Sequence, residues 1–221
     1  MRHFDVRLAL LSACAMAVYL ALAVWAWGDV SDFFSHPARL GLVIGSGILA
    51  VVASFSGISA LSGGRREFVS GRWIFAPLFC LALALAYLPP YADRHDFWTL
   101  DGDLVRCLGL AVFLLGSTLR LVSMFVLGSR FSLLVAIQPN HKLKKDGIYR
   151  FIRHPSYTGA LLALVGSVLI YRSGIGLLLI LVLLPVIIWR IKDEEQFLES
   201  EFGAEYSEYR RKTWRLLPFL Y

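Results

Sequence analysis

Charged residues are scarce in this sequence. Only 17% of its 221 residues are Asp, Glu, Lys or Arg, whereas 57% are hydrophobic. A soluble domain of this size carries about a quarter charged residues, so the composition is that of a membrane protein. The three cysteines match no metal-ligand or disulfide pattern, and we expect no metal site. Linkers and low-complexity tracts are also lacking, which predicts a single integral domain over residues 1–221.

The hydrophobic residues form blocks long enough to cross a bilayer. About 20 helical residues span the roughly 30 Å hydrocarbon layer, and lipid-embedded backbone must satisfy its own hydrogen bonds, which favours helices over a barrel. The blocks are 8–27, 40–61, 73–90, 104–127 and 158–191. A polar break at 171–174 divides the last block and predicts a tight turn. The sequence therefore predicts an all-α, polytopic transmembrane bundle of about six spans, the last two forming a hairpin.

Loop charges predict the orientation. The loop at 65–72, the insert at 130–153 and the tail after Arg190 are rich in Lys and Arg, whereas the loops at 28–37 and 91–103 carry acidic residues. Basic loops remain on the cytoplasmic side, so we expect both termini and the basic insert there. The net charge of +6 follows from these loops. We therefore expect no nucleic-acid partner, and membrane lipid around the helices.

The sequence turns abruptly polar after the last apolar block. Apolar residues at helical spacing predict that this helix continues into the cytoplasm to Phe202, and Gly203 is a typical helix stop. A short amphipathic segment, 205–214, is then expected to lie against the membrane surface.

The insert from His141 to Gly159 concentrates polar and basic side chains between two membrane-length blocks. Such clustering at the bilayer edge suggests a pocket for a charged ligand. Because Pro155 suits the first turn of a helix, His154 is predicted to cap the helix that follows. A helix start offers free N–H groups and partial positive charge to an anion. An ordinary basic cap that touches lipid headgroups is the alternative.

Arg190 and Glu194 lie four positions apart and share one helical face. One interpretation is an exposed ion pair that contributes about 0.3 kcal/mol to stability. In the other, Arg190 faces an anionic ligand while Glu194 faces a cationic one. Glu195 points another way, and we expect it to be solvated.

Arg120 lies within the fourth apolar block. An intramembrane Arg costs at least ~2.5 kcal/mol on insertion scales, so it normally faces a cavity or a partner. Snorkelling to the inner surface is the alternative. We favour a cavity and take Arg120, with Arg190, as a candidate catalytic residue.

The motifs H-x-L-x-x-x-G-x-Y-x-x-x-R-H-P-S-Y-x-G, R-x-x-x-E-E and F-G-x-x-Y-x-x-Y follow one another from about residue 128 to the C-terminus. This spacing resembles the isoprenylcysteine carboxyl methyltransferase family of integral membrane enzymes, which use S-adenosylmethionine. The resemblance implies a cofactor-binding and catalytic region over 128–221, preceded by membrane helices over 1–127.

The resemblance also implies roles for individual residues. Arg190 corresponds to the substrate contact, and Ala160 stands where the family usually has an aromatic residue. The implied cofactor contacts are Gln138, His141, Lys142, Leu143, Lys144, Tyr149, His154, Pro155, Ser156, Tyr157 and Glu194.

The chemistry of these residues is consistent with the resemblance. A helix start, basic side chains and a nearby Glu complement the carboxylate and the cations of S-adenosylmethionine. A carboxylate acceptor is already ionised near neutral pH and needs no general base. Reaction between an anion and a cation neutralises charge, and a dry site that orients both reactants lowers the barrier. The sequence thus predicts a methyltransferase for a lipophilic acceptor, with the prenylated cysteine carboxyl as the implied one.

Other functions stay open at this point. Phospholipid N-methylation and small-thiol S-methylation belong to the same class, although each requires removal of a proton. The ending from Tyr206 to Tyr221 also resembles the tail of sterol reductases, which would bind NADPH. A transporter or scaffold is the non-catalytic alternative, but no pair of broken helices in corresponding halves supports it.

Overall fold

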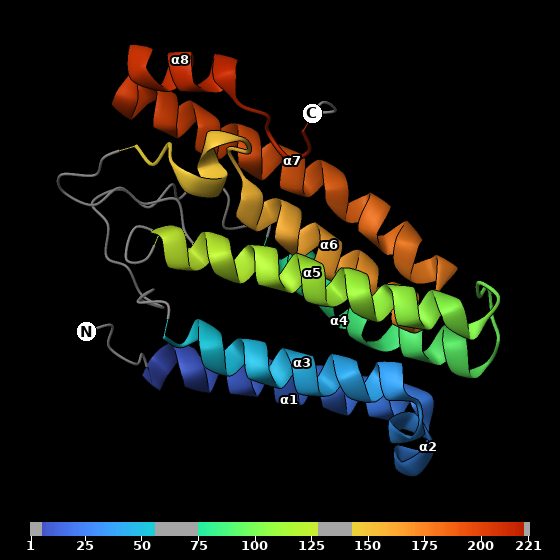
Figure 1. Ribbon diagram of the computed structural model, residues 1–221. Coiled ribbons are helices and arrows are strands. Elements are labelled where there is room, and N and C mark those ends of the chain that lie inside the picture. The colour runs from blue at the N-terminus through green and yellow to red at the C-terminus, as the bar shows by residue number, and fades with distance from the viewer. Residues whose placement is uncertain (1–5, 56–74, 128–142, 219–221) are drawn as a thin grey trace.

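The structure is a computed structural model that describes residues 6–55, 75–127 and 143–218. Long helices run side by side, and the short α8 lies at one end beside the end of α7 (Figure 1). The elements are α1 (Val6–Trp27), α2 (Val30–Ser35), α3 (Pro37–Ala53), α4 (Phe75–Arg94), α5 (Asp103–Leu127), η3 (Gly147–Arg150), α6 (Pro155–Ile170), α7 (Gly174–Phe202) and α8 (Ala204–Lys212).

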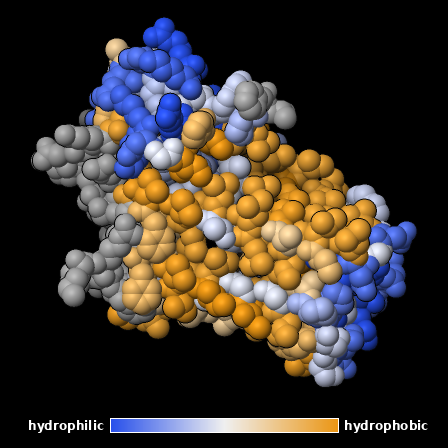
Figure 2. Space-filling view, viewed as in Figure 1, coloured by the Kyte–Doolittle hydropathy of each residue, from blue (hydrophilic) through white to orange (hydrophobic). Residues whose placement is uncertain are grey.

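The predicted all-α membrane fold is confirmed. Within the described ranges, α1, α4, α5 and α7 contain stretches long and apolar enough to cross a membrane, and α3 and α6 are shorter apolar helices. Figure 2 shows the corresponding surface, an apolar belt between two hydrophilic ends. The protein is therefore integral to a membrane, whereas the count of six spans stays a prediction.

Helix boundaries differ from the apolar blocks by a few residues: α4 continues to Arg94, past the predicted end at Pro90, and α3 already ends at Ala53. α3 begins at Pro37, because His36 accepts a hydrogen bond from the Ala38 N–H at 3.1 Å. The acidic loop before it contains α2, which Asp29 caps by accepting from the Asp32 N–H at 2.9 Å. Residues 56–61, at the end of the second predicted block, lie outside the described residues.

The C-terminal third follows the prediction closely. α7 continues to Phe202, and Gly203 ends it with a φ of +53°. α8 ends at Lys212, two residues before the predicted end of the amphipathic segment. Thr213 is extended, and Trp214 pairs with Ile152 in an isolated parallel bridge. This bridge places the tail against the residues that lead into α6.

α5 and α6 make the closest helix contact of the bundle, through two pairs of glycines. A Cβ atom on Gly109 would lie 2.6 Å from the backbone nitrogen of Ile170, and one on Gly159 would lie 2.6 Å from that of Arg120. Gly116 and Gly166 face backbone atoms of the opposite helix in the same way. Small residues let backbones approach in lipid, so these glycines set the separation of α5 and α6.

Gly109→Ala should lower the midpoint of thermal unfolding in detergent, because its methyl group meets backbone that cannot rotate away. Overpacking of this kind costs about 1–3 kcal/mol. Gly47→Ala is the matched control, since a Cβ on Gly47 has nothing within 4 Å. Equal midpoints for the two variants would contradict this account of α5–α6 packing.

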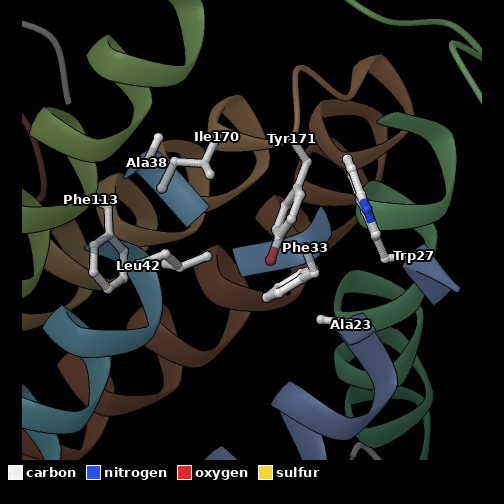
Figure 3. Close-up of a cluster of buried hydrophobic side chains, with 8 residues drawn as sticks. All are labelled: Ala23, Trp27, Phe33, Ala38, Leu42, Phe113, Ile170 and Tyr171. Carbon is white, nitrogen blue, oxygen red and sulfur yellow. The ribbon is translucent and has the colours of Figure 1, made fainter. Parts of the chain in front are cut away.

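A buried aromatic and aliphatic cluster fixes the end of the bundle away from α8. Figure 3 shows Tyr171 beside Phe33, with Trp27 and Ala23 on one side and Leu42 on the other. Close by, the buried Asp93 receives hydrogen bonds from Arg106 and, at 3.0 Å, from Arg172. These contacts tie the turn between α6 and α7 to the earlier helices, so both helices extend from a fixed base.

Candidate functional site

The free ends of α6 and α7 meet at the opposite end, beside η3 and α8 (Figure 1). The Tyr157 phenol, in the first turn of α6, bridges two side chains of α7. It accepts a hydrogen bond from Arg190 Nε at 3.0 Å and donates one to Glu194 Oε2 at 3.0 Å. The four-residue spacing puts Arg190 and Glu194 on one face of α7, as the sequence predicted. A cation and a carboxylate are thus held together at one half-buried hydroxyl.

Tyr149 reaches the same region from η3. Its buried phenol donates to the Ser123 carbonyl of α5 at 3.4 Å, and its own carbonyl accepts from the Tyr209 hydroxyl at 2.7 Å. Burial, and then the negative charge of Glu194, raise the pKa of Tyr149 above its ordinary value. The phenol therefore stays protonated near neutral pH. Gly147 begins η3 with a φ of +61°, a conformation that favours glycine.

His154 occupies the N-cap position of α6, as predicted, with Pro155 at the first helical position. Its carbonyl accepts from the backbone N–H groups of Tyr157 and Thr158. The imidazole does not cap the helix; its Nε2 lies 3.3 Å from Glu195 Oε1, and its ring packs edge-on to Tyr157 with centroids 5.8 Å apart. The side chain is therefore turned toward α7.

The expectation that Glu195 is solvated is wrong. It is only 3% exposed, and it binds Arg153 Nε at 3.0 Å and Arg215 Nη2 at 2.7 Å besides His154. Helical periodicity cannot reveal this, because the residues that cover Glu195 come from the segment before α6 and from the tail after α8.

Arg120 has a partner at the start of α6. Its Nη1 donates to the Ser156 carbonyl at 3.4 Å, and the side chain is half-buried. This hydrogen bond gives the Arg120 guanidinium a polar partner within an apolar helix and places it beside the start of α6. Whether Arg120 faces a cavity or snorkels to the inner surface stays a prediction.

The remaining predicted cofactor contacts lie at the start of α6, in the loop before η3 or outside the described residues. Pro155 and Ser156 are buried at the start of α6, and Leu143 is half-buried. Lys144 makes an ion pair with Asp146 at 2.9 Å. Gln138, His141 and Lys142 lie outside the described residues.

The C-terminal tail is a component that the sequence reasoning missed. The Arg153 and His154 N–H groups donate to the Trp214 and Arg215 carbonyls at 2.8 and 3.1 Å, and Thr158 Oγ1 donates to the Leu216 carbonyl at 2.7 Å. The F-G-x-x-Y-x-x-Y pattern marks only α8, just before this tail: its last tyrosine, Tyr209, donates to the Tyr149 carbonyl of η3.

A cavity of about 660 Å³ lies elsewhere, between α3, α5 and the loop before η3. Its α5 lining residues form one face, whereas Arg120 and Ser123, which contact the site, point roughly the other way. We therefore treat this cavity as distinct from the junction of α6 and α7, although its lining includes Lys144, one of the predicted cofactor contacts. Its lining residues are Val52, Thr118, Leu121, Val122, Phe125, Val126, Lys144, Asp146 and Gly147.

Comparison with known proteins agrees with this organisation. The profile of the isoprenylcysteine carboxyl methyltransferase (ICMT) family matches residues 108–200, which include α6 and most of α7. A probable protein-S-isoprenylcysteine O-methyltransferase of Oryza sativa subsp. indica is 29% identical over 176 residues, 74% of this chain and 87% of that relative. The protein-S-isoprenylcysteine O-methyltransferase B of Arabidopsis thaliana is 33% identical, over 69% of this chain and 76% of that one.

A solved structure shares the fold. The eukaryotic intramembrane Ras methyltransferase ICMT superimposes with a TM-score of 0.58 at 20% identity, over 95% of this chain and 75% of that chain. The chain therefore shares the polytopic helical membrane fold of that structure. The chain belongs to the isoprenylcysteine carboxyl methyltransferase family.

Proposed function

We propose that this protein transfers a methyl group from S-adenosylmethionine to the carboxylate of an isoprenylcysteine. One observation carries the proposal: Tyr157 holds Arg190 and Glu194 together at the junction of α6 and α7. A carboxylate substrate requires a cation, and a sulfonium or ammonium group requires an anion, so this pair can serve both reactants. The names of the relatives support this acceptor.

The described residues fit the cofactor. Glu194 offers a half-buried carboxylate to a cation, and the Tyr157 phenol donates a hydrogen bond to it. His154, Pro155 and Ser156 would form the adjoining wall, at the start of α6. When bound there, S-adenosylmethionine supplies an electrophilic methyl group on a sulfonium.

The protein's part in the reaction is to orient and to desolvate. Arg190 would bind the acceptor carboxylate and aim one oxygen at the methyl carbon. Held there by Arg190, that oxygen would accept the methyl group as the C–S bond breaks, with a methyl ester and a neutral thioether as the products. No proton has to be moved, because the acceptor is ionised near neutral pH. Orientation and exclusion of water are then the main sources of acceleration.

The membrane setting suits such an acceptor. An isoprenyl chain partitions into lipid, and the candidate site lies at one end of the apolar belt (Figure 2). We place both termini and the site on the cytoplasmic side, because basic loops stay there. Residues 1–127 would supply the membrane helices and 128–221 the cofactor-binding and catalytic region.

The test is methyl transfer from labelled S-adenosylmethionine by purified protein. We expect label in N-acetyl-S-farnesylcysteine, and its release as methanol by mild base, which identifies a methyl ester. Phosphatidylethanolamine, a small thiol, and NADPH with a sterol are the competing substrates. Activity with one of these instead of the farnesylated acid would overturn the proposal.

A further inference from the structure

Glu195 is a second carboxylate at the end of α7 with surroundings unlike those of Glu194. It is almost fully buried and has three cationic or ionisable partners: Arg153, His154 and Arg215. Arg215 is bidentate, with Nε 3.2 Å from Glu195 Oε1 and Nη2 2.7 Å from Glu195 Oε2. Burying a carboxylate costs free energy unless such partners are present, so the burial of Glu195 depends on these three side chains.

The partners of Glu195 come from two segments that are distant in sequence. Arg153 and His154 precede α6, and Arg215 follows α8. The same segments are also joined through backbone hydrogen bonds, from Trp214 N to the Phe151 carbonyl at 3.0 Å and from Arg153 N to the Trp214 carbonyl at 2.8 Å. Arg153 further donates to the carbonyls of Arg210 and Thr213. Glu195 is thus the point where α7, the entry to α6 and the tail meet.

The two adjacent glutamates contact the start of α6 at residues three positions apart. Glu194 receives the Tyr157 hydroxyl, and Glu195 faces the His154 imidazole. Neighbouring residues of a helix point about 100° apart, so one side chain can face the site while the other faces its support. Fixing His154 against α7 fixes the first turn of α6, and with it the position of Tyr157 between Arg190 and Glu194.

We propose that Glu195 is a positioning residue that clamps the C-terminal tail and the entry to α6 onto α7, and thereby aligns Tyr157 with Arg190 and Glu194. This inference rests on the proposed function. It assigns the tail around Arg215 to the support of the reaction site, whereas Glu194 and Arg190 face the ligands.

Glu195→Gln is the first test, with purified full-length protein, labelled S-adenosylmethionine and N-acetyl-S-farnesylcysteine. We expect kcat to fall about 100-fold, the size of effect that small misplacement of reacting groups can cause. The KM for the acceptor should stay within about threefold, because Arg190 remains on α7. Glu199→Gln is the matched control: Glu199 lies one turn further on α7 and binds Arg210 at 3.3 Å, but its side chain is 43% exposed. Its kcat should stay within about threefold, as expected of an exposed substitution.

Substitutions of Arg215 test the clamp from the tail and leave the carboxylate in place. Arg215→Ala should lower kcat in the same way, and Arg215→Lys should restore part of it, since lysine keeps the charge but not the bidentate geometry. The double variant Glu195→Gln/Arg215→Ala should lose no more than about the Glu195→Gln variant, because Arg215 acts through its contact with Glu195.

Three results would overturn the inference. The first is a kcat for Glu195→Gln close to that of Glu199→Gln, and the second is losses that multiply in the double variant. If Glu195→Gln does not fold, the variants Arg215→Ala and Arg215→Lys test the clamp instead. The third contradicting result is then a wild-type kcat for Arg215→Ala. Wild-type protein that methylates no acceptor would instead overturn the proposed function, and this inference with it.

Discussion

Arg190→Ala should lower kcat/KM for the farnesylated acceptor about 100- to 1,000-fold. Removal of one partner from a desolvated charge pair costs about 2–5 kcal/mol, and each ~1.4 kcal/mol is tenfold in rate. Arg190 is half-buried and donates a hydrogen bond to Tyr157, which holds its guanidinium in one orientation. Affinity for S-adenosylhomocysteine should stay within about threefold, because Glu194 and Tyr149 remain.

The separation between turnover and cofactor affinity is the informative part of this result. Steady-state kinetics and isothermal titration calorimetry on the same preparation measure both quantities. Lys192→Ala is the control, since Lys192 lies two residues along α7 and is exposed. Equal losses of turnover and of S-adenosylhomocysteine affinity in Arg190→Ala would contradict the assignment of Arg190 to the acceptor.

Glu194→Gln should have the opposite profile and weaken the cofactor side first. A hydrogen bond to a charged group contributes about 1.5–3 kcal/mol, so we expect cofactor affinity to fall about 10- to 100-fold. The amide keeps the shape of the side chain and can still accept from Tyr157. Changes in affinity therefore report the loss of charge. Glu201→Gln, on the exposed surface of the same helix, is the control.

Two ligands distinguish which cation Glu194 faces. Sinefungin carries an amine in place of the sulfonium, whereas S-adenosylhomocysteine has a neutral thioether, and both carry the α-ammonium group. If Glu194 faces the sulfonium, calorimetry will show a larger loss for sinefungin; if it faces the ammonium, the losses will be equal. Unchanged affinity for both ligands would refute a cofactor role for Glu194.

The sequence predicts the local features of this fold well. Apolar blocks give the membrane helices, the shift to polar residues at α7 gives the extension to Phe202, and Gly203 marks its end. These features depend on hydrophobicity, helical spacing and a glycine with positive φ, all of which are local. The contact between α5 and α6 was missed, although Gly109 and Gly116 repeat at the same spacing as Gly159 and Gly166. Which helices pair is a tertiary property that single-helix patterns do not contain.

For the candidate site, too, the sequence predicts local spacing but not the contacts between distant segments. The spacing of Arg190 and Glu194 places both on one face, but not the phenol that bridges them. Helical periodicity alone predicts a solvated Glu195, because its partners Arg153 and Arg215 lie 42 and 20 positions away in the sequence. Such long-range ion pairs depend on how the segment before α6 and the tail after α8 pack against α7. The sequence gives no spacing rule for that packing.

The most direct test of the account is an experimental structure of the protein with S-adenosylhomocysteine. Our account predicts density for the ligand at the junction of η3, α6 and α7, in contact with Tyr149, Tyr157 and Glu194. Ligand density in the cavity between α3 and α5, with Tyr157 and Glu194 untouched, would contradict it.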